Sequence, residues 1–219
     1  MTDVYILNME KQLSNNRIIY LSRFVDDKKQ SKITQLKFIE DKQNTLLADL
    51  IIRSELSKRT GTPNECLRFF SNVFGKPYCL NALQIHYNIS HSGEFVVCAI
   101  SDKPVGIDVE KISEANLKMA KRFFTNTEYE YITSKPENEQ ACAFSEIWTK
   151  KESYIKHEGK GLAIPLKSFD VLDAKNEFYF NNVYISEEMI CNVCSCKNDE
   201  PSVSEINIDE LISIFKKEK

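Results

Sequence analysis

Two apolar segments, each followed directly by a glycine, constrain the fold of this chain more than any other feature. Residues 41–60 carry leucine and isoleucine at helical spacing before Gly61, and residues 138–158 carry apolar side chains at the same spacing before Gly159. Glycine often closes helices because it adopts the left-handed conformation without a steric penalty. The pattern therefore predicts two long helices with equivalent ends.

The two predicted helices also correspond to each other position by position. When Gly61 is aligned with Gly159, Arg53 falls opposite Lys151, and strand-like runs follow both helices. This agreement indicates a chain that contains two related units, although the sequence signal of duplication is faint.

Short strand-like runs separated by turns occupy the region between the helices. The turns HSGE at 91–94 and DKP at 102–104 contain residues that favour chain reversal. Two short helices are predicted between residues 114 and 132, the second with Thr125 as its N-cap and Glu128 three residues later. The predicted strands cover residues 67–73, 84–90, 95–101, 105–110, 168–173, 177–185 and 189–196. Helices and strands in separate runs indicate an α+β fold.

The composition argues against several classes of function. With 219 residues, 42% of them hydrophobic, the chain can bury a proper core. A net charge of −3 provides no basic surface for nucleic acid. The N-terminal residues lack the basic region of a secretory signal, and no apolar run is long enough to span a membrane. We therefore expect a cytoplasmic protein with neither nucleic acid nor membrane as its partner.

The seven cysteines are scattered along the chain and odd in number, which favours reduced thiols over a disulfide framework. Cys191, Cys194 and Cys196 form the densest group. They are interpreted either as a zinc site or as small buried apolar residues. The second interpretation is favoured, because no second cysteine pair and no histidine lies near them in the sequence.

The run VGIDVEKI at 105–112 places two carboxylates in an otherwise apolar strand. Because side chains of a strand alternate between its faces, Asp108 and Glu110 point to one side, and Ile107 and Val109 point to the other. Neighbouring carboxylates repel each other unless water or a cation lies between them. The run is therefore either a solvated strand face or half of a metal site.

The second long helix carries a charged and apolar face in the segment WTKKESYIKHEGKG at 148–161. Spacings of three and four place Lys151, Glu152 and Lys156 on about the same side as Trp148 and Ile155. On its own this pattern is typical of a solvated, salt-bridged surface. The carboxylates of the strand favour the alternative, a site shared by strand and helix.

Three further features are compatible with phosphate binding. Lys29 and Lys32 on their own are typical solubilising lysines. Gly75, Lys76 and Pro77 are typical of a turn. Ser90 and His91 are typical of the end of a hairpin. The sequence contains no glycine-rich loop of the Walker or dinucleotide-binding type. A diphosphate would therefore have to be held by scattered cations and a metal ion.

Four blocks of the sequence together resemble the signature of a known family. They are NISHSG at 88–93, GIDVE at 106–110, KRFFTNTEY at 121–129 and WTKKESYIKHEGKGL at 148–162. In this order and spacing they resemble the Sfp-type 4′-phosphopantetheinyl transferases, and the resemblance extends from about Lys29 to Phe169. GIDVE alone is a weak signal, whereas GIDVE followed about forty residues later by the helix motif is specific.

The resemblance implies an enzyme that moves the phosphopantetheine arm of coenzyme A onto a serine hydroxyl of an acyl or peptidyl carrier protein. The by-product is adenosine 3′,5′-bisphosphate. It also implies a monomer with two similar α+β halves packed side by side, which we place at residues 1–103 and 104–219, and an active site between them. The cofactor implied by the resemblance is Mg²⁺, with Mn²⁺ as the alternative, and the implied co-substrate is coenzyme A. The pathway of the carrier, whether fatty-acid, polyketide or peptide synthesis, stays open.

The resemblance also assigns roles to individual residues. Asp108, Glu110 and Glu152 are the implied metal ligands, and Glu152 is either mainly a ligand or mainly the general base. Lys151 and Lys156 are implied to be catalytic and to face the phosphates. The implied coenzyme pocket adds Lys29, Lys32, Arg53, Gly75, Lys76, Pro77, Ser90 and His91. Carrier docking is expected along residues 117–131, where Met119 and Phe123 are either docking or core residues.

Two other functions compete with the transferase. A carrier-binding adaptor without catalysis has no need to keep like charges crowded together, so the acidic residues argue against it. A nucleotide-binding regulatory domain would bind coenzyme A or its bisphosphate without turnover. Transfer to a carrier separates the three.

Overall fold

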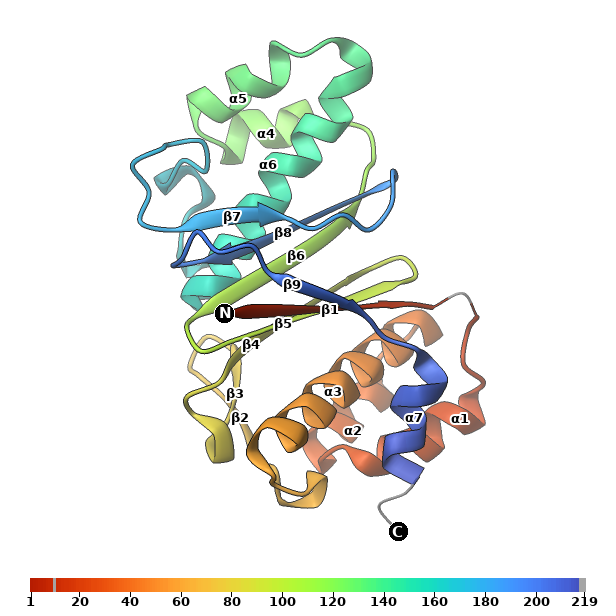
Figure 1. The fold of residues 1–219 in the computed structure, drawn as a ribbon. Helices are drawn as coiled ribbons and strands as arrows, with labels where there is room; N and C mark the ends of the chain where they lie inside the picture. The colour runs from red at the N-terminus through yellow and green to blue at the C-terminus, as the bar shows by residue number, and fades with distance from the viewer. Residues whose placement is uncertain (10, 217–219) are drawn as a thin grey trace.

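Two sheets lie face to face in the middle of the molecule, with helices on both outer sides (Figure 1). The computed structural model describes residues 1–9 and 11–216. In the first half, the sheet order is β4 (His86–Ser92), β5 (Phe95–Ser101), β1 (Thr2–Asn8) and β9 (Ser202–Glu205). In the second half it is β6 (Val105–Lys111), β8 (Met189–Ser195) and β7 (Tyr179–Asn182). Val4 and Val97 of one sheet pack with Ile107 and Val193 of the other, so a shared core joins the halves.

The first half has its own helical layer, centred on α3 (Ile39–Thr60), which packs on β5. Leu50 and Ile51 of α3 are fully buried against Val96 of the sheet. The helices around α3 are α1 (Asn15–Leu21), α2 (Asp27–Gln35) and α7 (Ile208–Lys216).

In the second half, α6 (Glu137–Glu158) lies across β6 and β8, and α4 (Leu117–Phe123) and α5 (Asn126–Thr133) pack near its beginning (Figure 1). Gly106 of β6 lies where α6 comes closest to the strand. A Cβ atom at this position would overlap the backbone of Ser153 and of His157. The absence of a side chain at residue 106 is therefore what allows β6 and α6 to approach each other.

Strand β6 shows the alternation that the sequence predicts. Ile107 and Val109 are fully buried in the core between the sheets. The opposite face of β6 carries Gly106, Asp108 and Glu110. Gly106 lies against α6, and the two carboxylates line the cavity described below. The prediction that both carboxylates share one face is therefore confirmed.

A small hairpin of β2 (Phe69–Ser71) and β3 (Pro77–Cys79) follows α3. Its loop reaches across the boundary between the halves and contacts the end of α6. The hairpin therefore belongs to the first half in sequence and touches the second half in space.

The two long helices support the predicted duplication. Helices α3 and α6 are both 22 residues long and end at Gly61 and Gly159, whose φ angles are 69° and 68°. The aligned residues Arg53 and Lys151 are both buried, and each forms an ion pair with a carboxylate. The two α+β halves therefore share an internal plan as well as a similar order of elements.

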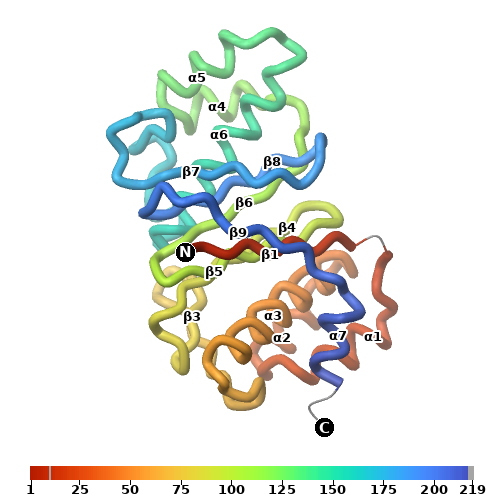
Figure 2. Tube along the Cα trace, in the orientation of Figure 1, coloured from red at the N-terminus to blue at the C-terminus, as the bar shows by residue number. Residues whose placement is uncertain are grey.

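Several elements were not predicted from the sequence, namely β1, α1, α2, β3, β9 and α7. Figure 2 shows that the chain returns at its C-terminal end to the first half, where β9 runs parallel to β1 and α7 packs on α3. Residues 202–216 were predicted to be part of the second half, and their position is a correction to that division.

The predicted strand at 168–173 is also wrong, because the segment forms a short 3-10 turn at Leu166–Ser168 and then a loop. Side-chain carboxylates accept hydrogen bonds from backbone N–H groups that would otherwise pair with a neighbouring strand. The N–H of Val171 donates to Glu128 Oε1 at 2.8 Å, and the N–H of Leu172 donates to Asp170 Oδ1 at 2.9 Å. The predicted capping box of α5, by contrast, is present between Thr125 and Glu128.

Candidate active site

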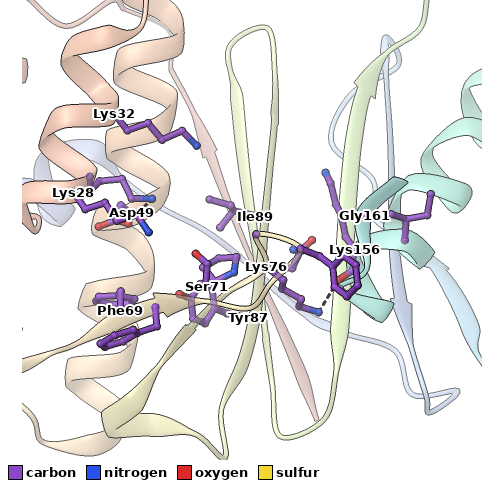
Figure 3. A pocket seen from close by; sticks show the side chains of 18 of the residues that line it. Lys28, Lys32, Asp49, Phe69, Ser71, Lys76, Tyr87, Ile89, Lys156 and Gly161 are labelled. Atoms are coloured by element: carbon purple, nitrogen blue, oxygen red, sulfur yellow. Dashed lines mark hydrogen bonds and ion pairs between the residues drawn. The ribbon is translucent and has the colours of Figure 1, made fainter. Parts of the chain in front are cut away.

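Two adjoining cavities of about 540 and about 490 Å³ lie at the boundary between the halves. Figure 3 shows the larger one, with Lys28 and Lys32 on the side of α2 and with Lys156 and Gly161 on the side of α6. Residues that line both cavities include Lys29, Lys32, Glu152 and Lys156. The volumes lie in the range typical of sites for small molecules and cofactors.

The carboxylates of β6 are positioned by hydrogen bonds from the neighbouring strand β4. Ser90 Oγ donates to Asp108 Oδ1 at 2.9 Å, and Ser92 Oγ donates to Glu110 Oε2 at 3.4 Å. Asn88 Oδ1 accepts from the backbone N–H of Ile107 at 2.9 Å. The motifs NISHS and GIDVE are therefore joined by hydrogen bonds between the two sheets. Every second residue of β4, from Asn88 to Ser92, forms one of these bonds.

Glu152 reaches the same cavity from α6, one turn before Lys156. Burial raises the pKa of Glu152 above its ordinary value, and the negative charge of Asp108 raises it further. The pKa of Glu110 is raised by burial and by Asp108, and the side chains of Trp148 and Lys156 oppose this shift. Three carboxylates from a strand and a helix therefore share one partly desolvated space in which they repel one another.

Lys156 provides the nearest positive charge to these carboxylates. Its Nζ lies 2.6 Å from Asp108 Oδ1 and 2.9 Å from Ser90 Oγ. Burial raises the pKa of Asp108, and this ion pair opposes the rise. Three ionised carboxylates and one ammonium group leave two negative charges, which one divalent cation would balance.

The donor set fits a hard divalent cation, because Mg²⁺ prefers carboxylate oxygen and keeps several waters. Asp108 is only 3% exposed, and its Oδ2 atom is buried without a hydrogen-bond partner. Among residues 1–9 and 11–216, no three acidic, histidine or cysteine side chains have the arrangement of a formed metal site. Binding a cation would therefore require the carboxylates to draw together.

The larger cavity combines cationic and aromatic walls. Lys28, Lys29 and Lys32 come from α2, and Phe69 and Tyr87 come from the β2–β3 hairpin and β4. Positive charge at one wall and aromatic rings at another suit a ligand that carries both phosphate groups and an aromatic base.

Two family models match adjoining segments of this sequence. Residues 12–103 match a family model described as 4′-phosphopantetheinyl transferase, N-terminal, and residues 104–203 match the 4′-phosphopantetheinyl transferase superfamily. The chain is 38% identical over 219 residues to the 4′-phosphopantetheinyl transferase gsp of Aneurinibacillus migulanus, which covers 96% of this chain and 92% of the relative. The chain belongs to the Sfp-type 4′-phosphopantetheinyl transferase family.

Two further members of this transferase family show how widely it extends. Identity to the 4′-phosphopantetheinyl transferase Sfp of Bacillus subtilis is 33% over 222 residues, covering 95% of this chain and 99% of the relative. The L-aminoadipate-semialdehyde dehydrogenase-phosphopantetheinyl transferase of Homo sapiens is 30% identical over 162 residues, covering 68% of this chain and 52% of that protein. The predicted enzymatic activity, 4′-phosphopantetheinyl transfer, is therefore confirmed for this chain.

Most of the site residues predicted for the transferase line one of the two cavities. Asp108, Glu110 and Glu152 line the smaller one, and no comparison tests their role as metal ligands. The other predicted residues at the cavity walls are Lys29, Lys32, Gly75, Lys76, Pro77, Ser90, His91 and Lys156. The predicted face of α6 is therefore formed by Trp148, Glu152, Ile155 and Lys156.

Lys151 lines neither cavity, which differs from the orientation predicted for this residue. Its side chain is 0% exposed and pairs with Glu128 of α5 at 2.8 Å. Its Nζ also donates to the carbonyl oxygens of Leu166 and Phe169 at 2.7 and 2.8 Å. Because successive residues of a helix are separated by about 100°, Lys151 lies about 140° from Lys156 around the axis of α6. This turn directs Lys151 towards α5 and away from the cavity.

The buried pair makes a prediction for stability. Lys151→Met is expected to lower the free energy of unfolding by about 3 kcal/mol, because it leaves the Glu128 carboxylate buried without its partner. Urea denaturation measures the change, and adding Glu128→Gln is expected to restore part of it. Lys150→Met is the matched control, because the partly exposed pair of Lys150 with Glu146 contributes at most about 1 kcal/mol. If Lys151→Met left stability unchanged and weakened the binding of coenzyme A, the result would support a role of Lys151 in phosphate binding.

Arg53 and Lys76 also differ from the predicted direct contacts with the coenzyme. Arg53 is only 2% exposed, and its guanidinium is held by Asp49 at 2.6 Å and Asp26 at 2.7 Å. It stacks on Phe69 from behind the cavity wall, 4.4 Å from the ring centre. The Nζ of Lys76 points towards the end of α6, where it donates to the carbonyl oxygens of Lys156 and His157, and it also donates to that of Val105 in β6. Its aliphatic stem faces the cavity.

The sequence interpretation missed the aromatic wall and the acidic residues beneath it. Phe69 is followed directly by another phenylalanine, and Tyr87 alternates with polar residues in a strand. Both patterns are equally typical of core, so no sequence signal marks these rings as ligand contacts. Asp49 lies on the buried face of α3 and pairs with Lys29 at 2.9 Å. Its position among leucine and isoleucine residues is the signal that could have indicated a functional or structural ion pair.

Proposed function

We propose that the two cavities bind coenzyme A and that the chain transfers its phosphopantetheine arm to a serine hydroxyl of an acyl or peptidyl carrier protein. The observation that carries this proposal is the crowding of Asp108, Glu110, Glu152 and Lys156 where the cavities meet. Such crowding of like charges is costly in a structural role and is typical of a site that handles phosphate with a cation.

The larger cavity would hold the nucleotide end of the coenzyme. Lys29 and Lys32 of α2, which line this cavity, would meet its phosphates, and the rings of Phe69 and Tyr87 would pack against adenine. The diphosphate would then lie towards the smaller cavity, near His91 and Lys156.

Asp108, Glu110 and Glu152 would hold Mg²⁺ or Mn²⁺. When bound, such an ion supplies charge neutralisation at the diphosphate during attack on phosphorus. Asp108 and Glu110 belong to β6 and Glu152 belongs to α6, two elements of the second half that pack against each other.

The protein's own groups supply the movement of protons and the orientation of the reactants. The carrier serine attacks the phosphorus that bears pantetheine, the P–O bond to the bisphosphate breaks, and adenosine 3′,5′-bisphosphate leaves. Glu152 accepts the serine proton as the general base. Lys156 stabilises the charge of the departing bisphosphate.

The carrier protein would dock beside the smaller cavity on the segment of α4 and α5. Helix α4 carries Lys118, Lys121 and Arg122, and the ring of Phe123 is 37% exposed. Met119 packs with the apolar cluster of the second half, so of the two residues Phe123 is the docking candidate. A basic and partly apolar helix suits a carrier with an acidic and apolar recognition surface.

We propose a monomer that acts in the cytoplasm. All seven cysteines are free thiols, three of them exposed, as expected in a reducing compartment. No helix among the described residues is long and apolar enough to cross a membrane.

Intact-protein mass spectrometry of the carrier tests the proposal. Incubation with coenzyme A and Mg²⁺ is expected to add one phosphopantetheine arm to an apo carrier, and acyl and peptidyl carriers are compared in parallel. Failure with every carrier, but with coenzyme A still bound, would instead support an adaptor or a regulatory nucleotide-binding domain.

Lys32→Met is expected to weaken the binding of coenzyme A about tenfold. Lys32 is exposed at the cavity wall, so its removal costs one charge contact with phosphate and little packing. Titration calorimetry at two salt concentrations measures the effect, and the variant should be less sensitive to salt than the wild type. Lys197→Met, at an exposed lysine outside both cavities, is the control. If Lys32→Met and the wild type bound coenzyme A with equal affinity, the result would contradict a contact between Lys32 and phosphate.

A further inference from the structure

The loop of the β2–β3 hairpin is bonded to the C-terminal end of α6, in the other half of the molecule. Lys76 Nζ donates to the carbonyl oxygens of Lys156 at 2.6 Å and His157 at 2.9 Å. It also donates to the carbonyl of Val105 at the start of β6, at 3.1 Å. Asn72 Nδ2 donates to the carbonyl of Gly159 at 2.8 Å. These four contacts tie one loop to a helix end and to a strand.

These contacts provide hydrogen-bond donors for backbone carbonyl groups at the end of α6. The last carbonyl groups of a helix have no partner within it, and positive charge is favourable there because of the helix dipole. Lys76 and Asn72 donate hydrogen bonds to these carbonyl groups from outside the helix, and Lys76 also brings the positive charge. Gly159 has room for this cap only because it lacks a side chain, since a Cβ atom would lie 2.6 Å from Lys76 Cδ.

The loop itself is held in a fixed shape by Asn72. Its Oδ1 accepts from the backbone N–H groups of Phe74 and Lys76, both at 2.9 Å. Gly75 has a φ of 93°, which allows the tight reversal between these residues. One asparagine therefore shapes the loop and, through its amide nitrogen, binds it to α6.

The same contacts reach the reacting end of the site. Lys156 accepts from Lys76 through its carbonyl oxygen, and its own Nζ lies at Asp108. Loop and helix also form one wall of the larger cavity, through Gly75 and Pro77 on one side and Ile155 on the other. A displacement of the loop would therefore move the coenzyme wall and the base of the Lys156 side chain together.

We propose that Lys76 and Asn72 are positioning residues, which cap α6 from the opposite half and hold Lys156 in register with the bound coenzyme. This proposal rests on the proposed function and adds a role that differs from phosphate binding. Burial lowers the pKa of Lys76 to about 8, as expected for an ammonium group enclosed by protein.

The test compares Lys76→Met and Asn72→Ala with Lys32→Met. The measured quantities are kcat and KM for coenzyme A, well below the unfolding temperature, and the Kd of adenosine 3′,5′-bisphosphate at two salt concentrations. Lys76→Met is expected to lower kcat about tenfold to a hundredfold, because small displacements of positioned groups have effects of this size. Asn72→Ala, which changes no charge, is expected to lower kcat about tenfold. Neither should change the salt dependence of the Kd, whereas Lys32→Met should weaken it.

Three outcomes would overturn the proposal. In the first, Lys76→Met reproduces the salt behaviour of Lys32→Met while Asn72→Ala matches the wild type, which makes Lys76 a phosphate ligand. In the second, both variants unfold at lower temperature but keep the kcat of the wild type, which makes the contacts merely structural. In the third, both variants match the wild type in every measurement. Absence of transfer by the wild type with every carrier is a separate result and counts against the proposed function.

Discussion

Replacing Glu152 by glutamine is expected to lower kcat by about 10²- to 10⁴-fold, which is the usual contribution of a general base. Glutamine keeps the size of the side chain but cannot accept the serine proton. It also removes one of the three carboxylates proposed to hold the cation. The fold should persist, because the substitution relieves the repulsion by Asp108 and Glu110 that raises the pKa of Glu152.

The comparison requires a carboxylate on the same helix that lies outside the site. Glu139→Gln fits, because Glu139 is exposed in the first turn of α6. Transfer is followed by the mass of the carrier at saturating coenzyme A and Mg²⁺, and circular dichroism checks the fold. Turnover by Glu152→Gln at the rate of Glu139→Gln would contradict any direct role of Glu152 in the reaction.

Gly106→Ala is expected to cost about 4 kcal/mol or more in the free energy of unfolding, more than most overpacking substitutions. The added Cβ atom would overlap backbone atoms of Ser153 and His157, and backbone cannot rotate away as a side chain does. Helix α6 would have to move away from β6 along their whole contact. Activity should fall as well, since this contact positions Glu152 relative to Asp108.

Gly93→Ala provides the matched control for this prediction. A Cβ atom at Gly93 has no neighbour within 4 Å, but the φ of 57° there costs an alanine about 1 to 2 kcal/mol. Urea denaturation of both variants separates the overlap at residue 106 from the general cost of replacing a glycine. A loss at Gly106→Ala no larger than at Gly93→Ala would show that β6 and α6 can separate freely.

The sequence predicted the parts of the site that depend on local periodicity. Alternation in the strand places Asp108 and Glu110 on one face, and helical spacing places Glu152 and Lys156 on another; both predictions agree with the structure. The glycines at 61 and 159 end their helices as predicted, because this function depends on one residue and its own φ angle.

Residues whose role depends on distant partners were not predictable in this way. Lys151 lies at the edge of the charged face, and only the position of Glu128 on α5 decides that it turns inward. Lys76 lies in a turn, and two of its three acceptors belong to α6, about eighty residues later in the chain. Strand β9 pairs with β1 from the other end of the chain, a contact that no local pattern indicates.

Counting bound Mn²⁺ tests most directly whether the carboxylates of β6 and α6 together hold one cation at the coenzyme. Electron paramagnetic resonance reports the free ion during titration of the protein with Mn²⁺ in the presence of coenzyme A. The wild type is expected to bind one Mn²⁺ per chain, and Asp108→Asn is expected to bind it at least about tenfold more weakly, since it loses a charged oxygen ligand. Equal affinity of the two proteins, or no bound Mn²⁺ in the wild type, would contradict the proposed site.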